Sequence, residues 1–300
     1  CEEVEENEPD NRPEHQRVGS EDAEYVDLVN YAVDNDKISP RFLALLSLAN
    51  DSECANYYLE PQFQDDSGNL TPYDEISEAI AGSGKAAVID SKIIKKAADM
   101  LRHEEFATHV FHIPLSAASF GDVSFVDRLS KVIEHFKLKP WNFSFVITSK
   151  DVRQNLAQAK DFCTRSRQLG CGCYISRFAE GEDDIALVRE IPVTGIWFSN
   201  KLSEGFSSNE NKLQRLKDLG NVMKSNDMKT ILGNIHSPSD LANAWGIGVD
   251  FITGPFLHKG SVLASMFAYH MRASVLSWHK YSCALWINWL AQIFQPWHCC

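Results

Sequence analysis

Apolar residues recur along this chain at two spacings, one typical of buried strands and one typical of amphipathic helices. Short apolar runs bounded by polar turns predict strands at 55–63, 107–115, 141–148, 171–176, 193–199, 230–234 and 250–253. Apolar residues three or four positions apart predict helices at 91–101, 122–136, 151–169, 183–190, 208–224 and 237–245. The run at 42–48 fits either a buried strand or a short helix. From residue 107 onward, strands and helices therefore alternate.

This alternation predicts an α/β fold in which parallel strands are joined by right-handed crossovers. Repeated strand–helix units over most of the chain suit a closed (β/α)8 barrel. An open doubly wound sheet is the alternative, and such a sheet usually carries a glycine-rich nucleotide-binding turn. The candidate turn is GSGK at 82–85, but Ala79 and Ala86 stand where a P-loop needs Gly and Ser or Thr. We therefore expect the barrel.

The two ends of the chain differ in composition from the alternating part. Residues 1–20 are acidic and nearly free of apolar side chains, which predicts a disordered linker, and a short helix is predicted at 21–36. Four of the seven Trp lie in 261–300, where we expect a helical tail that packs on the barrel or on a partner. A membrane-surface helix and a non-native ending are the alternatives for this tail. The predicted organisation is a linker and helix at 1–37, the barrel at 38–260, and the apolar and aromatic tail at 261–300.

Charge and cysteine content narrow the class of protein. The net charge of −12 argues against general nucleic-acid binding, which needs a basic surface. The eight cysteines are too dispersed for a zinc-ligand spacing, and their use fits a reducing, cytoplasmic setting. The chain begins with Cys rather than Met, so we expect a fragment of a longer chain, with a lipidated mature N-terminus as the alternative.

The stretch LGCGCYISRFAEG at 169–181 lies where barrel enzymes hold their catalytic residues. Gly170 can end the preceding helix in the left-handed conformation, and the strand at 171–176 then ends in a polar turn. Catalytic side chains of such barrels gather at the C-terminal ends of the strands. Ser176 and Arg177 occupy this place, where a metal-dependent enzyme would present carboxylates.

Six segments resemble, in the right order, the signature segments of the EAL domain family, the cyclic-di-GMP phosphodiesterase barrel. They are FHIPLSAAS at 111–119, FSFVITS at 143–149, YISRFAEG at 174–181, IPVTGIWFS at 191–199, ILGNIHS at 231–237 and GVDFITGPF at 248–256. The resemblance extends from about residue 39 to 260 and implies a modified TIM-type (β/α)8 barrel of the EAL kind. Phrases at 161–163, 168–171, 175–178 and 241–245 are most similar to the non-catalytic FimX-type receptors.

The resemblance also implies that the family's catalytic and metal-binding residues are missing. Their positions fall here on Tyr58, Pro114, Val146, Ser149, Ser176, Arg177, Trp197, Gly233, His236 and Thr253. Hydrolysis of a phosphodiester through two metal ions needs several converging carboxylates. We therefore expect no catalytic residues, no metal, no cofactor and no enzymatic activity. Glu60 shares a strand face with Tyr58 and would be the signature Glu after a register error, but one carboxylate cannot hold two divalent ions.

Loss of the metals does not abolish nucleotide binding, because the FimX-type domains are similar in lacking activity and still bind. The residues expected to meet such a ligand are Tyr58, Gln62, Asp90, Arg177, Phe178 and Trp197. The three aromatic rings can stack on guanine, Asp90 can meet a guanine edge, and Arg177 can replace the phosphate-binding Arg that falls on Gln62. Each has a structural alternative: Phe178 in the core, Tyr58 and Trp197 filling the barrel mouth, and Arg177 solvated or ion-paired.

We therefore expect a catalytically inactive EAL domain of a bacterial signalling protein. It acts by binding cyclic-di-GMP or by docking a protein partner, and by resemblance that partner belongs to type IV pilus or PilZ-type signalling. The alternatives are a pure interaction scaffold with a filled barrel mouth, an enzyme of another class that uses Glu60, His236 and Arg177, and a residual phosphodiesterase. Homodimerisation and membrane contact by the tail stay open.

Overall fold

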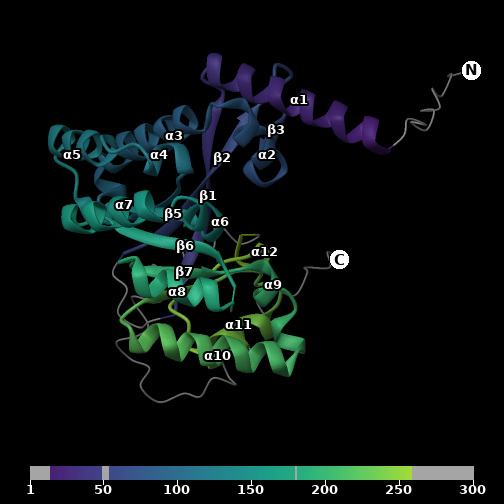
Figure 1. The fold of residues 1–300 in the computed structure, drawn as a ribbon, viewed down its shortest axis with the longest axis vertical. Helices are drawn as coiled ribbons and strands as arrows, with labels where there is room; N and C mark the ends of the chain where they lie inside the picture. The colour runs from purple at the N-terminus through teal and green to yellow at the C-terminus, as the bar shows by residue number, and fades with distance from the viewer. Residues whose placement is uncertain (1–13, 49–53, 180, 259–300) are drawn as a thin grey trace, which may run out of the picture.

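Residues 14–48, 54–179 and 181–258 are described by the computed structural model of the chain. Eight strands close into a barrel with helices around it (Figure 1). In order around the barrel they are β1 (Ile38–Ser47), β9 (Phe251–Ile252), β8 (Lys229–Leu232), β7 (Gly195–Phe198), β6 (Gly172–Phe178), β5 (Phe143–Thr148), β4 (Val110–Pro114) and β2 (Asn56–Gln64). The ring closes because β1 pairs with both β9 and β2. The expected modified (β/α)8 barrel is confirmed.

The direction of β1 departs from the expectation of parallel strands. From β2 through β4 to β9 each strand runs parallel to the next, but β1 is antiparallel to both of its neighbours. Its pairing with β2 is long, with Ile38 opposite Phe63. Because β2 pairs with β4 only as far as Tyr58, the distal part of the β1–β2 hairpin extends past the end of β4. The short β3 (Leu70–Pro72) pairs with this extension, which we call the hairpin arm.

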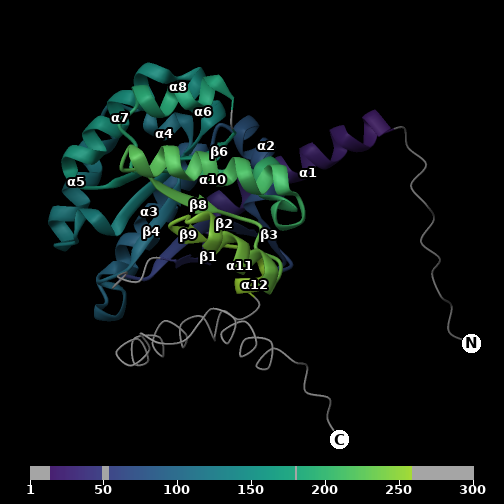
Figure 2. The same cartoon turned by 90° about the horizontal axis from the view of Figure 1, so that it is seen from below.

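The longer helices pack on the outside of the strands, as Figure 2 shows for α5, α7, α8 and α10. They are α2 (Tyr73–Ser83), α3 (Ala86–Leu101), α5 (Phe125–Phe136), α7 (Leu156–Leu169), α8 (Glu182–Glu190), α10 (Glu210–Ser225) and α11 (Pro238–Ile247). Short helices follow several strand ends: α4 (Ala117–Phe120), α6 (Ser149–Gln154), α9 (Asn200–Ser203) and α12 (Pro255–His258). Single 3-10 turns lie at Glu104–Phe106, Pro140–Asn142 and Phe206–Ser208.

The helix α1 (Glu14–Asp34) precedes the barrel. It begins inside the range 1–20 for which the sequence predicted an unstructured linker, so the predicted short helix at 21–36 is extended toward the N-terminus. Val29, Ala32 and Val33 are buried, and α1 packs beside α2. These apolar residues supply the burial on which most helices in proteins depend.

Two apolar layers result from the alternation of side chains along each strand. On β6, Ile175 points outward into the layer between strands and helices, whereas Tyr174 points into the barrel. The outer layer holds most of the large buried side chains, including Phe111, Phe145 and Phe162. Among the described helices, none has the length and apolar character that a membrane crossing requires. The tail predicted at 261–300 lies outside the described residues.

Candidate functional site

The candidate site is the end of the barrel where the parallel strands finish, which we call the barrel mouth. In parallel barrels, side chains at these strand ends form the ligand and catalytic sites. Here the inward-facing side chains form one apolar cluster inside the barrel. Its members are Leu45, Tyr58, Val146, Tyr174, Trp197, Ile231 and Phe251. The barrel interior at the candidate site is therefore packed with hydrocarbon and aromatic groups.

Tyr58 on β2 and Trp197 on β7 meet in this cluster. Their ring centroids are 5.0 Å apart at an interplanar angle of 80°, an edge-to-face contact of the kind that contributes about 0.5–1.5 kcal/mol beyond area burial. The indole of Trp197 also lies against Gly233, just beyond β8: a Cβ atom at Gly233 would be 3.4 Å from Trp197 Nε1. The absence of a side chain at Gly233 thus makes room for Trp197, and a longer side chain there would displace the indole.

His112 on β4 lies deeper in the same interior. Its ring packs edge-on against Tyr174, with centroids 5.0 Å apart, and against Phe251. Asn56 Nδ2 donates to the Cys54 carbonyl, which leaves Asn56 Oδ1 facing His112 Nε2 at 3.1 Å. His112 Nε2 therefore carries the proton in this hydrogen bond. Burial lowers the pKa of His112 from 6.5 to about 3, because the charged imidazolium would lose its hydration.

Gln62 and Glu60 lie on the hairpin arm, on the same face of β2 as Tyr58. Glu60 is buried and forms an ion pair with Arg41, which stands opposite it on β1. Gln62 is half-buried between Ser39 on β1 and Pro72 on β3. Both side chains therefore belong to the arm, past the last paired residue of β2 and β4. The ion pair with Arg41 occupies the one carboxylate that could have served as a signature Glu.

Asp90 has a structural role in this conformation. It is buried on α3, and its Oδ2 accepts hydrogen bonds from the Ser116 amide (2.9 Å), the Ser116 hydroxyl (2.6 Å) and the Ser119 hydroxyl (2.7 Å). Burial raises the pKa of Asp90, and the bonds from Ser116 and Ser119 act in the opposite direction. Asp90 thus fixes the start of α4 after β4. Asp90 was expected to meet a guanine edge, and its Oδ2 is engaged with protein donors.

Arg177 and Phe178 diverge at the end of β6, because a β-bulge interrupts the pairing between Ile175 and Phe178. Arg177 has a left-handed φ of 55° and is exposed, and it makes no ion pair within the described part of the chain. Phe178 is 0% exposed in the layer between strands and helices. This corrects the expectation for Phe178, because a fully buried ring offers no face to a nucleotide. Its structural alternative, a place in the core, is the one observed.

The turn after Phe178 is held by Asp184 on α8, a residue that the sequence did not single out. Asp184 is buried, accepts a hydrogen bond from the Ala179 amide at 2.7 Å and forms an ion pair with Arg153 on α6. The Ser149 hydroxyl donates to the Arg177 carbonyl at 3.2 Å. The backbone that carries Arg177 is therefore held on both sides.

The structure thus brings Tyr58 and Trp197 together and separates the other candidates. Sequence reasoning did not place His112, Tyr174 and Phe251 inside the barrel, although the period-two alternation along each strand could have done so, and it did not foresee that Gly233 makes room for Trp197. Within residues 14–48, 54–179 and 181–258, no three His, Cys, Asp or Glu side chains gather as metal ligands would. Two surface pockets, of about 220 and 240 Å³, are lined by none of the mouth residues. The set Glu60, His236 and Arg177 gains no support, since Glu60 is paired with Arg41 and the other two are exposed.

A family model and a curated protein both match this chain. The family model described as the EAL domain matches residues 28–259. The curated protein "Cyclic di-GMP phosphodiesterase PdeF" of Escherichia coli (strain K12) is 18% identical over 178 residues, which cover 59% of this chain. The match covers 24% of that protein, so the chain spans about a quarter of the length of its curated relative.

Solved structures of EAL domains share the fold. The FimX EAL domain from Pseudomonas aeruginosa bound to c-di-GMP has a TM-score of 0.72 and 23% identity over 78% of this chain and 94% of that chain. The FimX EAL domain of Xanthomonas citri in complex with c-diGMP has a TM-score of 0.71 and 14% identity over 81% and 95%. LapD of Vibrio cholerae, an S helix-GGDEF-EAL structure, has a TM-score of 0.67 and 15% identity over 78% and 56%.

Proposed function

Because this chain belongs to the EAL domain family, we propose that it is a non-catalytic EAL module that acts by docking a protein partner. The observation that carries the proposal is the packed barrel mouth. Tyr58 and Trp197 stand at the positions where the resemblance implies a metal-binding Glu and a catalytic Lys, and their rings contact each other. Trp197 has no oxygen ligand to offer, and the single phenol oxygen of Tyr58 cannot replace the several carboxylates that hold two divalent cations.

The remaining positions support the same conclusion. Val146 is buried and apolar, Pro114 has no side-chain donor or acceptor, and Gly233 provides space for Trp197. Two-metal hydrolysis needs carboxylates that hold both ions and orient the attacking water. The exposed guanidinium of Arg177 would oppose cations at the mouth. The side chains that replace the ligands thus fill the site instead of rebuilding it.

A cyclic-di-GMP receptor is the second candidate function. Tyr58 and Trp197 are only half-buried, and Arg177 is exposed beside the mouth, so stacking faces and a cation are near the surface. Several EAL structures that share this fold, two FimX EAL domains among them, are described with bound c-di-GMP. The contact between Tyr58 and Trp197 leaves no space between the two rings for a guanine, which favours the docking function over the receptor. A partner from type IV pilus or PilZ-type signalling, homodimerisation and a cytoplasmic location stay predictions.

The proposal is tested by a hydrolysis assay followed by calorimetry. With Mn²⁺ or Mg²⁺ in excess, we expect the chain to release no linear dinucleotide from cyclic-di-GMP, while the curated relative PdeF, named as a phosphodiesterase, serves as the positive control. Linear product above the background of a metal-free sample would overturn the non-catalytic assignment.

A calorimetric titration with cyclic-di-GMP separates the two candidates. We expect no heat of binding at micromolar ligand from the intact chain. The same titration is repeated with the variant Trp197→Ala, which removes the indole from the mouth, and its heat of binding is compared with that of the intact chain. Trp245→Ala, on α11, is the matched control. Micromolar binding by the intact chain would instead select the receptor function.

A further inference from the structure

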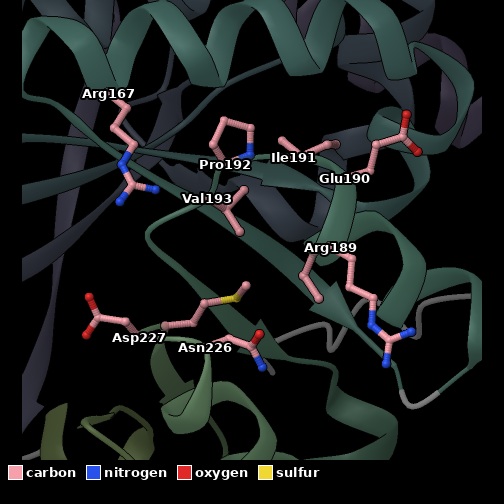
Figure 3. A pocket seen from close by; sticks show the side chains of 10 residues that line it. Arg167, Arg189, Glu190, Ile191, Pro192, Val193, Asn226 and Asp227 are labelled. Atoms are coloured by element: carbon pink, nitrogen blue, oxygen red, sulfur yellow. The ribbon is translucent and has the colours of Figure 1, made fainter.

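The pocket of about 220 Å³ lies at the end of the barrel opposite the mouth, where β7 and β8 begin. It is lined by the turn between α8 and β7, the turn between α10 and β8, and Arg167 in the last turn of α7. The buried Ile191 and Val193, with the half-buried Pro192 and Met228, form its apolar floor. Figure 3 shows Arg167 and Arg189 on opposite sides of this floor.

The charges around this pocket are only partly paired. Glu190 lies 3.8 Å from Lys160, but Arg167 and Arg189 are both exposed and make no ion pair within the described part of the chain. Asp227, at a left-handed φ of 55°, is the other charged residue on the rim. Two guanidinium groups that have no ion pair among the described residues therefore flank an apolar floor in a chain whose net charge is −12.

An exposed Trp lies at the same end of the barrel. Trp141, in the turn before β5, is 43% exposed. The preceding Pro140 lies against the end of α7, since a Cβ atom at Gly170 would be 3.3 Å from Pro140 Cβ. Arg167 is in the last turn of that helix. The turn of Trp141 and the rim of the pocket thus belong to one continuous surface.

We infer that this surface docks a partner protein through an acidic segment that carries one apolar side chain. We call it the basal docking surface, and it consists of Trp141, Arg167, Arg189 and the pocket floor. The inference rests on the proposed function and names the surface and the partner chemistry. Trp and Arg dominate binding hot spots in protein interfaces, and acidic side chains complement the two unpaired guanidinium groups.

The size and position of the pocket agree with this partner. A cavity of about 150 Å³ holds a benzene ring, so the pocket has the volume for one large apolar side chain. The N-terminal end of a barrel normally serves stability and not ligand binding. Stability does not account for two unpaired Arg and a solvent-exposed Trp at this end, because exposed charges and exposed rings add little to it.

The inference is tested with the fluorescein-labelled acidic peptide EDEEFDEE, whose one apolar side chain is Phe, and fluorescence anisotropy. We expect the intact chain to bind it at low salt and the double variant Arg167→Glu/Arg189→Glu to bind at least about tenfold more weakly. The matched control Lys131→Glu/Lys201→Glu makes the same change in net charge at exposed positions elsewhere, and we expect its affinity to change less than about twofold.

Trp141→Ala and Trp245→Ala form a second matched pair, because their rings are 43% and 46% exposed. We expect only Trp141→Ala to weaken peptide binding, and circular dichroism spectra show that each variant is folded. Absence of binding up to about 1 mM peptide, or equal losses in both double variants, would overturn the basal docking surface. Hydrolysis of cyclic-di-GMP by the intact chain would instead overturn the proposed function, whatever the peptide does.

Discussion

The buried imidazole of His112 makes the stability of the barrel depend on pH. Its pKa is lowered from 6.5 to about 3 by burial, so between these values the unfolded chain binds more protons than the folded chain. Stability therefore falls as the pH falls through this window. The linkage relation gives a decrease in the free energy of unfolding of about 2 kcal/mol between about pH 7.5 and pH 5, and of about 4 kcal/mol by pH 3.

The variant His112→Gln isolates this contribution. A Gln side chain can donate to Asn56 Oδ1 as the imidazole does, but it does not titrate. We expect the difference in unfolding free energy between the intact chain and His112→Gln to change by about 2 kcal/mol from about pH 7.5 to pH 5. Other titrating groups cancel in this difference, because they are present in both chains.

Urea unfolding at a series of pH values, followed by circular dichroism, measures both free energies. His236→Gln, at an exposed position between β8 and α11, is the matched control for the exchange of His for Gln. A difference between the intact chain and His112→Gln that stays constant within about 0.3 kcal/mol over this range would refute the buried, neutral imidazole.

Four further predictions concern the mouth and the segments that hold it. Trp197→Ala is expected to lower the unfolding free energy by about 2–3 kcal/mol, because it empties a packed interior. Gly233→Glu is expected to destabilise the intact chain more than it destabilises the Trp197→Lys variant. Urea unfolding of the intact chain, the two single variants and the double variant measures the coupling between positions 197 and 233. Asp90→Ala is expected to cost about 1–3 kcal/mol, because it leaves the donors of Ser116 and Ser119 without their acceptor, and a thermal melt unchanged by the substitution would contradict this. Arg177→Gly is expected to stabilise by about 0.5 kcal/mol, because relief of the left-handed φ slightly exceeds the entropy cost of Gly; a loss of stability in urea would contradict it.

The alternation of strands and helices was predictable because the two hydrophobic periods differ and each strand–helix unit repeats them. The antiparallel direction of β1 was not predictable, since a buried strand has the same pattern in either direction. Filling of the barrel mouth by Tyr58 and Trp197 was one of the alternatives that the sequence left open, but their contact with each other was not predicted. The hydrogen bonds of Asp90 were not predictable, because their donors, Ser116 and Ser119, lie in a segment far from Asp90 in the sequence.

Phe178 illustrates the limit of the period-two rule. Tyr174 points into the barrel, and simple alternation along β6 would send Ser176 and Phe178 inward as well. The bulge between Ile175 and Phe178, with Arg177 at a left-handed φ, shifts the register by one residue and turns Phe178 outward. A bulge without glycine leaves no signal in the sequence, so the orientation of Phe178 had to come from the structure.

The pairing of β1 with β9 determines when the barrel can form during synthesis. Leu46 stands opposite Ile252 and Ser47 opposite Phe251, so the first and the last barrel strands complete each other. Until the ribosome has released the last strand, β1 and β8 each keep an unpaired edge that can join another chain. Such long-range closure folds slowly. The nascent domain therefore keeps these open edges until β9 has been synthesised, and a truncation before β9 would make that state permanent.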